Sequence, residues 1–169
     1  IWSGSSEGFT YVSRPWTGDG VFSARVWSFS ATDSGAKAGI MFRETTATGA
    51  KNSIVYLMPA GSVTFQNKIT ANANVSYVSV SGQSIPEWIR LVRSGNKFSS
   101  YRSDDGITWT QIGSEITHSM AGTSLSVGLA VAPRTGGQMA NAIFDHATFL
   151  TPHEFWSCLL YTSDAAEEE

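Results

Sequence analysis

Cysteine is almost missing from this chain of 169 residues, because the single one is Cys158, near the C-terminus. A domain that ends before Cys158 can hold neither a disulfide nor a thiolate-bound metal. Charge is also sparse, since 11 basic and 14 acidic side chains make up 15% of the residues. The bases are scattered among the acids and form no basic stripe, so we expect no nucleic-acid partner. Apolar runs are all much shorter than a membrane span, and we expect no membrane partner.

The last thirteen residues differ from the rest of the chain. Their sequence resembles the translation of an adaptor used in sequencing libraries. We therefore expect residues 157–169 to be a non-native tail, residues 151–156 a connector and residues 1–150 one domain. The tail holds four acids and no base, so without it 11 bases face 10 acids and the net charge changes from −3 to +1. The alternative is a genuine acidic tail, which would not pack either.

Strand-like runs follow one another along the chain, each bounded by Gly, Pro, Asn, Asp or Ser. They cover residues 9–13, 21–29, 36–44, 52–58, 62–69, 75–80, 88–93, 97–103, 107–112, 125–132 and 141–149. No helical period separates them. About eleven short strands of this kind predict an all-β sandwich or barrel.

The clearest local signal lies in residues 88–113, where two glycine-containing turns separate three of these runs. Ser94-Gly95-Asn96 and Asp104-Asp105-Gly106 are hairpin-type turns, which predicts an antiparallel β-meander. The second turn, together with Trp109, resembles the Asp-box hairpin of sialidases. One residue is missing between the Asp and the Gly, and a propeller would repeat the hairpin in every blade. We interpret it as a well-made turn with a packed Trp109.

Alternation divides each run into two faces, and one face is apolar. Its side chains are the predicted inter-sheet core: Phe22, Ala24, Val26, Ala38, Ile40, Phe42, Val63, Phe65, Ile89, Leu91, Val127, Leu129 and Val131. The opposite face mixes guanidinium groups and indoles with small residues. One interpretation is that Trp27 and Trp88 roof the sheet, with arginines stacked on them and paired with Glu44 or Glu87.

The other interpretation of this mixed face is a groove for a sugar chain. Pyranose rings lay their C–H faces on flat aromatic rings, and their hydroxyls bond to Arg and Gln side chains. Alternation predicts that the candidate ligand contacts share one face; they are Arg25, Trp27, Arg43, Gln66, Trp88, Arg90 and Tyr101. No metal ligands are assigned. A structural calcium ion on Asp19, Asp33 or Asp145 is left open, because no loop has a recognisable ligand spacing.

Nine short sequence segments, in the order in which they occur along the chain, resemble those of one bacterial module family. They are Phe9-x-Tyr11-Val12, Thr17-Gly18-Asp19-Gly20, Phe22-x-Ala24-Arg25-Val26, AKAGIMFRE at 36–44, Phe65-Gln66, WIRLVR at 88–93, Ser103-x-Asp105-Gly106-x-Thr108-Trp109, Val127-Gly128-Leu129-Ala130 and Phe144-Asp145. The family has a concanavalin-A-like jelly-roll fold of two antiparallel sheets. It is often labelled after a regulation-of-enolase protein and is similar to the C-terminal module of β-xylosidases.

The resemblance implies a non-catalytic, carbohydrate-binding-type accessory module of a larger secreted bacterial protein. Its partners would be a polysaccharide or other glycan and the neighbouring domains of the parent protein, outside the cell or at its surface. Two departures stand out. Such modules begin some residues before Ile1, so we expect the first edge strand to be missing, and His146 stands where they carry Asn.

Two other functions compete with glycan binding. A glycoside hydrolase needs two carboxyl groups facing each other across a cleft, and no strand carries the E-x-D-x-E run of laminarinase-like jelly rolls. A polysaccharide lyase needs a His or Tyr base beside a neutralising Arg, and Tyr101 with Arg90 is the one pair that fits, while His118 is expected in a solvated loop. We therefore expect no enzyme. The alternative to a binder is a ligand-free structural or adhesive spacer.

Overall fold

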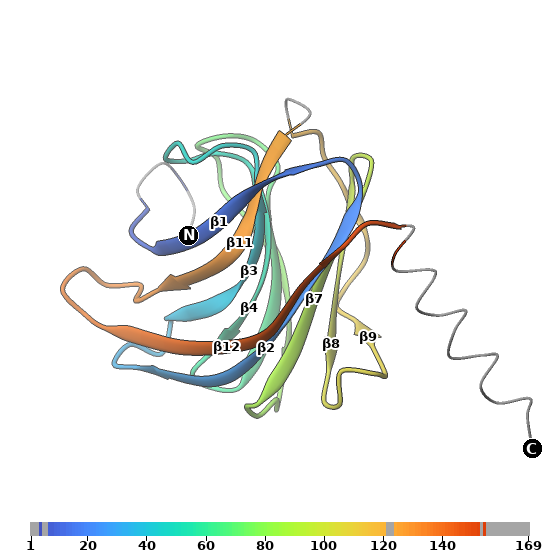
Figure 1. The fold of residues 1–169 in the computed structure, drawn as a ribbon. Coiled ribbons are helices and arrows are strands. Elements are labelled where there is room, and N and C mark those ends of the chain that lie inside the picture. The colour runs from blue at the N-terminus through green and yellow to red at the C-terminus, as the bar shows by residue number, and fades with distance from the viewer. Residues whose placement is uncertain (1–3, 5–6, 121–123, 153, 155–169) are drawn as a thin grey trace, which may run out of the picture.

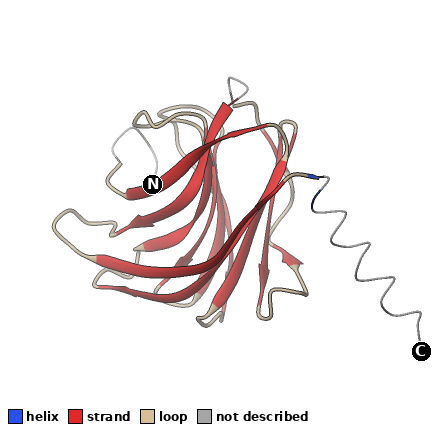
Figure 2. Cartoon of the chain, in the orientation of Figure 1, coloured by secondary structure: helices blue, strands red, loops and turns tan. Residues whose placement is uncertain are grey.

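The computed structural model describes residues 4, 7–120, 124–152 and 154, and the expected tail at 157–169 lies outside them. Within this part of the chain twelve strands form two antiparallel sheets that pack face to face (Figure 1). Figure 2 shows that strands make up most of the described residues. The all-β sandwich predicted from the sequence is confirmed. None of the helical segments in the described residues is long and apolar enough to cross a membrane.

Each sheet joins consecutive strands to strands from distant parts of the sequence. Sheet A has the order β1-β11-β3-β4-β5-β6, with β1 (Thr10–Thr17), β11 (Ser124–Ala132), β3 (Lys37–Arg43), β4 (Asn52–Met58), β5 (Ser62–Lys68) and β6 (Ser76–Ser81). Sheet B has the order β10-β8-β7-β2-β12, with β10 (Ile116–Thr117), β8 (Lys97–Ser103), β7 (Glu87–Ser94), β2 (Gly20–Ala31) and β12 (Ala140–Leu150). The short β9 (Thr110–Gln111) pairs with β8.

The core lies between the sheets and contains the side chains that alternation predicted. Phe22, Ala24 and Val26 of β2 meet Ala38, Ile40 and Phe42 of β3 in one buried cluster. Phe22 also stacks on Phe149, with ring centroids 4.0 Å apart. Leu129 is partly buried against this cluster, and Val131 is half-buried. Removal of this apolar surface from water is the main force that holds the sheets together.

The predicted meander is present, but its third strand is shorter than expected. The Asp105 carboxylate accepts hydrogen bonds from the amides of Ile107 and Thr108 at 2.8 Å each, and Ser103 Oγ accepts one from Gly106 N at 2.9 Å. The bonds to the carboxylate lower the pKa of Asp105 to about 2. They bend residues 104–108 into a turn, so β9 begins only at Thr110.

His118 is buried, and the expectation of a solvated loop is wrong. Its side chain is 6% exposed, its ring lies 4.8 Å from that of Phe98, and its Nε2 is 2.8 Å from Ser53 Oγ. Burial lowers the pKa of His118 to about 4. Alternation could not reveal this, because Ser53 belongs to β4, far away in the sequence.

Two glycines allow strands of sheet A to approach closely. A Cβ on Gly128 would lie 2.0 Å from the carbonyl oxygen of Val12 on β1, and one on Gly39 would lie 2.1 Å from that of Val55 on β4. Real Cβ atoms do not come so near to backbone. The pairing of β11 with β1 therefore requires glycine at position 128.

Gly128→Ala is expected to lower the free energy of unfolding by about 1–3 kcal/mol, because backbone must move to admit the methyl group. Gly136→Ala is the matched control, since a Cβ there meets nothing within 4 Å. Urea denaturation of both variants measures the difference. Equal stability of the two variants would contradict a close contact between β1 and β11.

The burial of His118 predicts a pH-dependent stability. The folded-state pKa is below the ordinary value of 6.5, so the unfolded chain binds the proton more readily, and stability falls as the pH drops through that window. From about pH 7 to about pH 5 the loss is expected to be about 2 kcal/mol, and His118→Gln should lack it. Denaturation curves at several pH values test this, and parallel profiles for the two proteins would refute it.

Candidate functional site

The seven predicted ligand contacts do not share one face. Arg25, Trp27, Trp88, Arg90 and Tyr101 lie on the outer face of sheet B, whereas Arg43 and Gln66 lie on the outer face of sheet A. The expectation of a single face is therefore wrong. Alternation tells which residues of a strand point together, but it does not tell which sheet the strand joins.

Arg43 is enclosed in an ion cluster on sheet A. Its Nη2 lies 2.5 Å from Glu7 Oε2, and its guanidinium also donates to the carbonyls of Thr45 and Ala47. Lys68 Nζ lies 2.9 Å from the other carboxylate oxygen of Glu7. Arg43 is 1% exposed, and it borders a pocket of about 350 Å³ that Glu7, Phe9 and Tyr11 also line. Of the two acids expected to pair with the outer-face arginines, Glu44 lies 3.4 Å from Lys51 and Glu87 lies 3.0 Å from Arg102.

Gln66 is enclosed in the same sheet. Its Oε1 accepts hydrogen bonds from Lys37 Nζ at 2.8 Å and from Tyr56 OH at 3.1 Å, and the side chain is 0% exposed. Burial lowers the pKa of Lys37 to about 7. Arg43 and Gln66 therefore belong to hydrogen-bonded networks on the outer face of sheet A, apart from the other five predicted contacts.

On sheet B, Arg25 holds a cluster that covers Trp88. Its guanidinium forms a bidentate hydrogen bond with the Asp145 carboxylate, from Nε to Oδ1 at 2.8 Å and from Nη2 to Oδ2 at 2.6 Å. The same group lies over the rings of Trp27 and Trp88. The other contacts of Trp88 are His146, at 5.1 Å between ring centroids, and Gly106, where a Cβ would lie 2.8 Å from the indole. The interpretation that the indoles cover the sheet and stack with arginine therefore holds for Trp88, while Trp27 remains 49% exposed.

The aspartates considered for calcium each take protein donors. Asp145 bonds to Arg25 and His146, which holds the pKa of its carboxyl well below the usual range. Asp33 accepts from Gly35 N and Thr135 Oγ1, and Asp19 accepts from Gly95 N. Among the described residues no three His, Cys, Asp or Glu side chains gather as a metal site would require.

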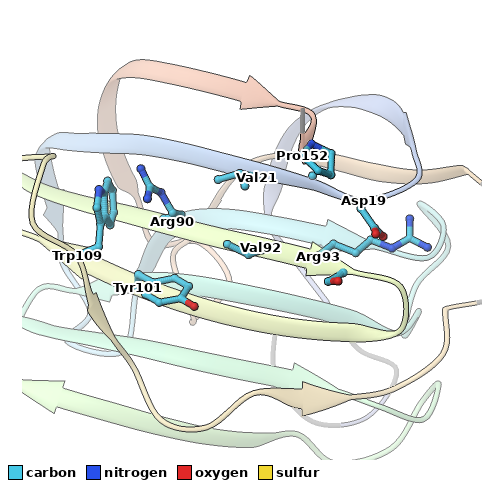
Figure 3. A pocket seen from close by; sticks show the side chains of 10 residues that line it. Asp19, Val21, Arg90, Val92, Arg93, Tyr101, Trp109 and Pro152 are labelled. Carbon is cyan, nitrogen blue, oxygen red and sulfur yellow. The ribbon is translucent and has the colours of Figure 1, made fainter. Parts of the chain in front are cut away.

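A pocket of about 420 Å³ opens on the outer face of sheet B beside this cluster (Figure 3). It is lined by Asp19, Gly20, Val21, Arg90, Val92, Arg93, Ser94, Tyr101, Trp109 and Pro152. Two of the predicted contacts, Arg90 and Tyr101, face each other across the β7–β8 pair and belong to it. Val21 and Val92, which pair across β2 and β7, form an apolar floor.

Arg90 and Trp109 form one end of the pocket. The Arg90 guanidinium lies 3.7 Å from the centroid of the Trp109 ring, and its Nε donates to Ser23 Oγ at 3.0 Å. Burial lowers the pKa of Arg90 to about 10. The indole Nε1 of Trp109 donates to Gly106 O at 3.2 Å, so the Asp105 turn fixes the ring in place.

Arg93 and Asp19 form the other end, as Figure 3 shows. Arg93 donates to the carbonyls of Gly95 and Gly18 at 3.2 and 3.1 Å, and Asp19 Oδ1 accepts from Gly95 N at 2.6 Å. These bonds tie the β1–β2 turn to the β7–β8 turn. Charged ends therefore flank an apolar middle.

Several lining residues could not be recognised from the sequence. The sequence predicts Trp109 as packing for the turn, and the structure also places its ring against Arg90 in the pocket. Alternation does not group Asp19, Arg93 and Pro152, because they come from the β1–β2 turn, from β7 and from the residues after β12, and the tertiary fold brings them together.

Comparison with known proteins supports the fold. No family model matches the sequence, and no curated protein does. A functionally unknown protein from Saccharomyces cerevisiae superimposes with a TM-score of 0.67 at 15% identity, over 90% of this chain and 82% of that chain. The carbohydrate binding module CBM66 from Bacillus subtilis gives 0.56 at 15%, over 89% and 91%.

A third similar structure is the GH43 protein BlXynB from Bacillus licheniformis, with a TM-score of 0.66 at 17% identity. The alignment covers 89% of this chain but 32% of that one, so this chain corresponds to about a third of it. At these identities the likeness concerns the fold. Together with the two antiparallel sheets it confirms the predicted jelly-roll sandwich.

The ion cluster around Glu7 predicts a large effect of one substitution. Burial alone would raise the pKa of Glu7, but hydrogen bonds from Arg43 and Lys68 lower it below the usual value. Its contribution to stability is therefore complete above the ordinary pKa of 4.5 and is lost as the pH falls. Glu7→Gln is expected to cost about 3–5 kcal/mol at neutral pH, because two buried cations lose their charged partner.

The matched control is Glu115→Gln, which removes a carboxylate from the exposed pair with Lys97. That change is expected to cost less than about 1 kcal/mol. Urea denaturation compares the two variants at low salt. If both proved equally stable, Glu7 could not be the centre of a stabilising ion cluster.

Proposed function

We propose that this chain is a non-catalytic carbohydrate-binding module that holds a sugar in the pocket on the outer face of sheet B. The observation that carries the proposal is the combination of an indole, a phenol and a guanidinium around an apolar floor, in Trp109, Tyr101, Arg90 and Val92. Apolar and aromatic surface suits the C–H face of a sugar ring, and the polar groups suit its hydroxyls. A volume of about 420 Å³ lies in the range of small-ligand sites.

The fold agrees with this proposal without deciding it. One similar structure is described as a carbohydrate binding module, and this chain covers 91% of it. Because one fold serves many functions, the pocket and not the likeness must carry the argument. The proposal extends to the context that the family resemblance implies: an accessory module of a secreted bacterial protein, acting outside the cell or at its surface beside other domains.

The lining favours binding over hydrolysis. Cleavage of a glycosidic bond uses two carboxyl groups, one as acid and one as base or nucleophile. Of the described residues that line the pocket, Asp19 alone is acidic, and its Oδ1 already accepts from Gly95 N. Tyr101 and Arg90, the pair considered for a lyase, both line the pocket, so cleavage has to be measured alongside binding.

Affinity electrophoresis through a panel of plant, algal and host polysaccharides tests the proposal. The wild-type protein is expected to be retarded by at least one of them. Trp109→Ala should weaken that retardation at least about tenfold, since a buried aromatic contact typically contributes about 2 kcal/mol or more to binding. Trp27→Ala is the matched control, because this exposed indole lies on the same sheet but outside the pocket.

The melting temperature of each variant confirms that it is folded. Lack of retardation of the wild type by any polysaccharide would favour the spacer alternative and overturn the proposal. Prolonged incubation with the retarding glycan should release neither reducing ends nor unsaturated sugars. Release that Tyr101→Phe abolishes would identify a lyase.

A further inference from the structure

The position of Arg90 indicates what kind of sugar fits the pocket. We propose that the ligand is an acidic glycan, whose carboxylate or sulfate group lies against the Arg90 guanidinium at the Trp109 end of the pocket. This inference rests on the proposed function and adds the chemical class of the glycan to it.

The guanidinium of Arg90 is held in a single orientation. The Trp109 ring supports one of its faces at 3.7 Å, and the bond from Nε to Ser23 Oγ, at 3.0 Å, turns that nitrogen toward β2. Arg90 lines the pocket, so a ligand that enters it lies beside this planar cation. A guanidinium fork matches the two oxygens of a carboxylate or sulfate better than it matches a single hydroxyl.

Burial makes this cation a better partner for an anion than for a neutral group. The pKa of Arg90 is lowered to about 10 because its surroundings exclude water that would otherwise solvate the charge. An anion at hydrogen-bond distance combines a charge-assisted bond with the attraction between opposite charges, which is stronger where water is excluded. A neutral hydroxyl accepts a hydrogen bond from the same guanidinium but adds no attraction between opposite charges.

The other charges of the pocket lie at its opposite end. Arg93 uses its Nε and Nη1 on the carbonyls of Gly95 and Gly18, so it stabilises the turns. The one carboxylate of the described lining, on Asp19, accepts from Gly95 N beside it. Figure 3 shows Asp19 next to Arg93 and separated from Arg90 by Val21 and Val92. An anion at Arg90 therefore avoids the repulsion of Asp19.

The apolar middle completes the fit. Val21 and Val92 form the floor, and Pro152 closes the pocket from beyond β12. A sugar ring whose charged substituent points to Arg90 would place its C–H face on these side chains. A single sugar residue would then contact Arg90 through its charge and the apolar floor through its C–H face.

Glycan pairs that differ only in charge test this inference on the wild-type protein. The first pair is polygalacturonate and its fully methyl-esterified form, and the second is a sulfated galactan and its desulfated form. We expect at least one acidic member to bind, and its neutral partner to bind at least about tenfold more weakly. Binding confined to the first pair identifies a carboxylate as the anion, and binding confined to the second identifies a sulfate.

Variants of Arg90 locate the effect. Arg90→Gln should abolish the preference for the acidic member, and Arg90→Lys should keep part of it, since the charge remains while the planar fork is lost. Arg134→Gln is the control, because it removes the same charge from an exposed side chain that meets Asp33, outside the pocket. If Arg134→Gln weakened binding as much as Arg90→Gln, non-specific attraction would explain the preference and the inference would fail.

The remaining outcomes separate this inference from the proposed function. Equal binding of the charged and neutral members, lost in Trp109→Ala, would overturn the acidic class and leave a carbohydrate-binding module. Binding of no glycan at all would overturn both. Melting curves show whether each Arg90 variant folds, and the comparison of matched glycans on the wild type needs no variant.

Discussion

The packing of sheet A on sheet B is the constraint from which the rest of the structure follows. Because strand side chains alternate, burying Phe22 and Ile89 between the sheets commits Arg25 and Arg90 to the outside. A shift of one residue in either strand would place guanidinium groups in the core, at a cost far above the stability of a small domain. The composition of each outer face is thus a consequence of the core.

The outer faces of the two sheets differ in how their polar side chains are bonded. On sheet A buried polar side chains bond to one another, since Glu7 joins Arg43 and Lys68 in an ion cluster and Lys37 bonds to Gln66. On sheet B the cluster around Arg25 closes one part and leaves the pocket beside Arg90 open. A ligand can replace water in such an open, partly apolar pocket, so the candidate site lies on sheet B.

The Asp105 turn connects local chemistry to this pocket. Its hydrogen bonds are short-range and can be anticipated from Ser103, Asp105 and Gly106 in the sequence. Their effect is to shorten β9 and to anchor the Trp109 indole over Arg90. A turn that serves as scaffold thereby also orients a wall of the candidate site.

The sequence alone determined the strands, the antiparallel meander and nearly all of the inter-sheet core, because turn residues and a period of two are local properties of the chain. It also identified Arg90 and Tyr101 as outward-facing neighbours. Only the tertiary structure decided that Arg43 and Gln66 belong to the other sheet and that His118 is buried against Ser53. It likewise brought Asp19, Trp109 and Pro152 to one pocket. These outcomes depend on which distant strands pair, and pairing is set by the burial of the whole core instead of by any single segment.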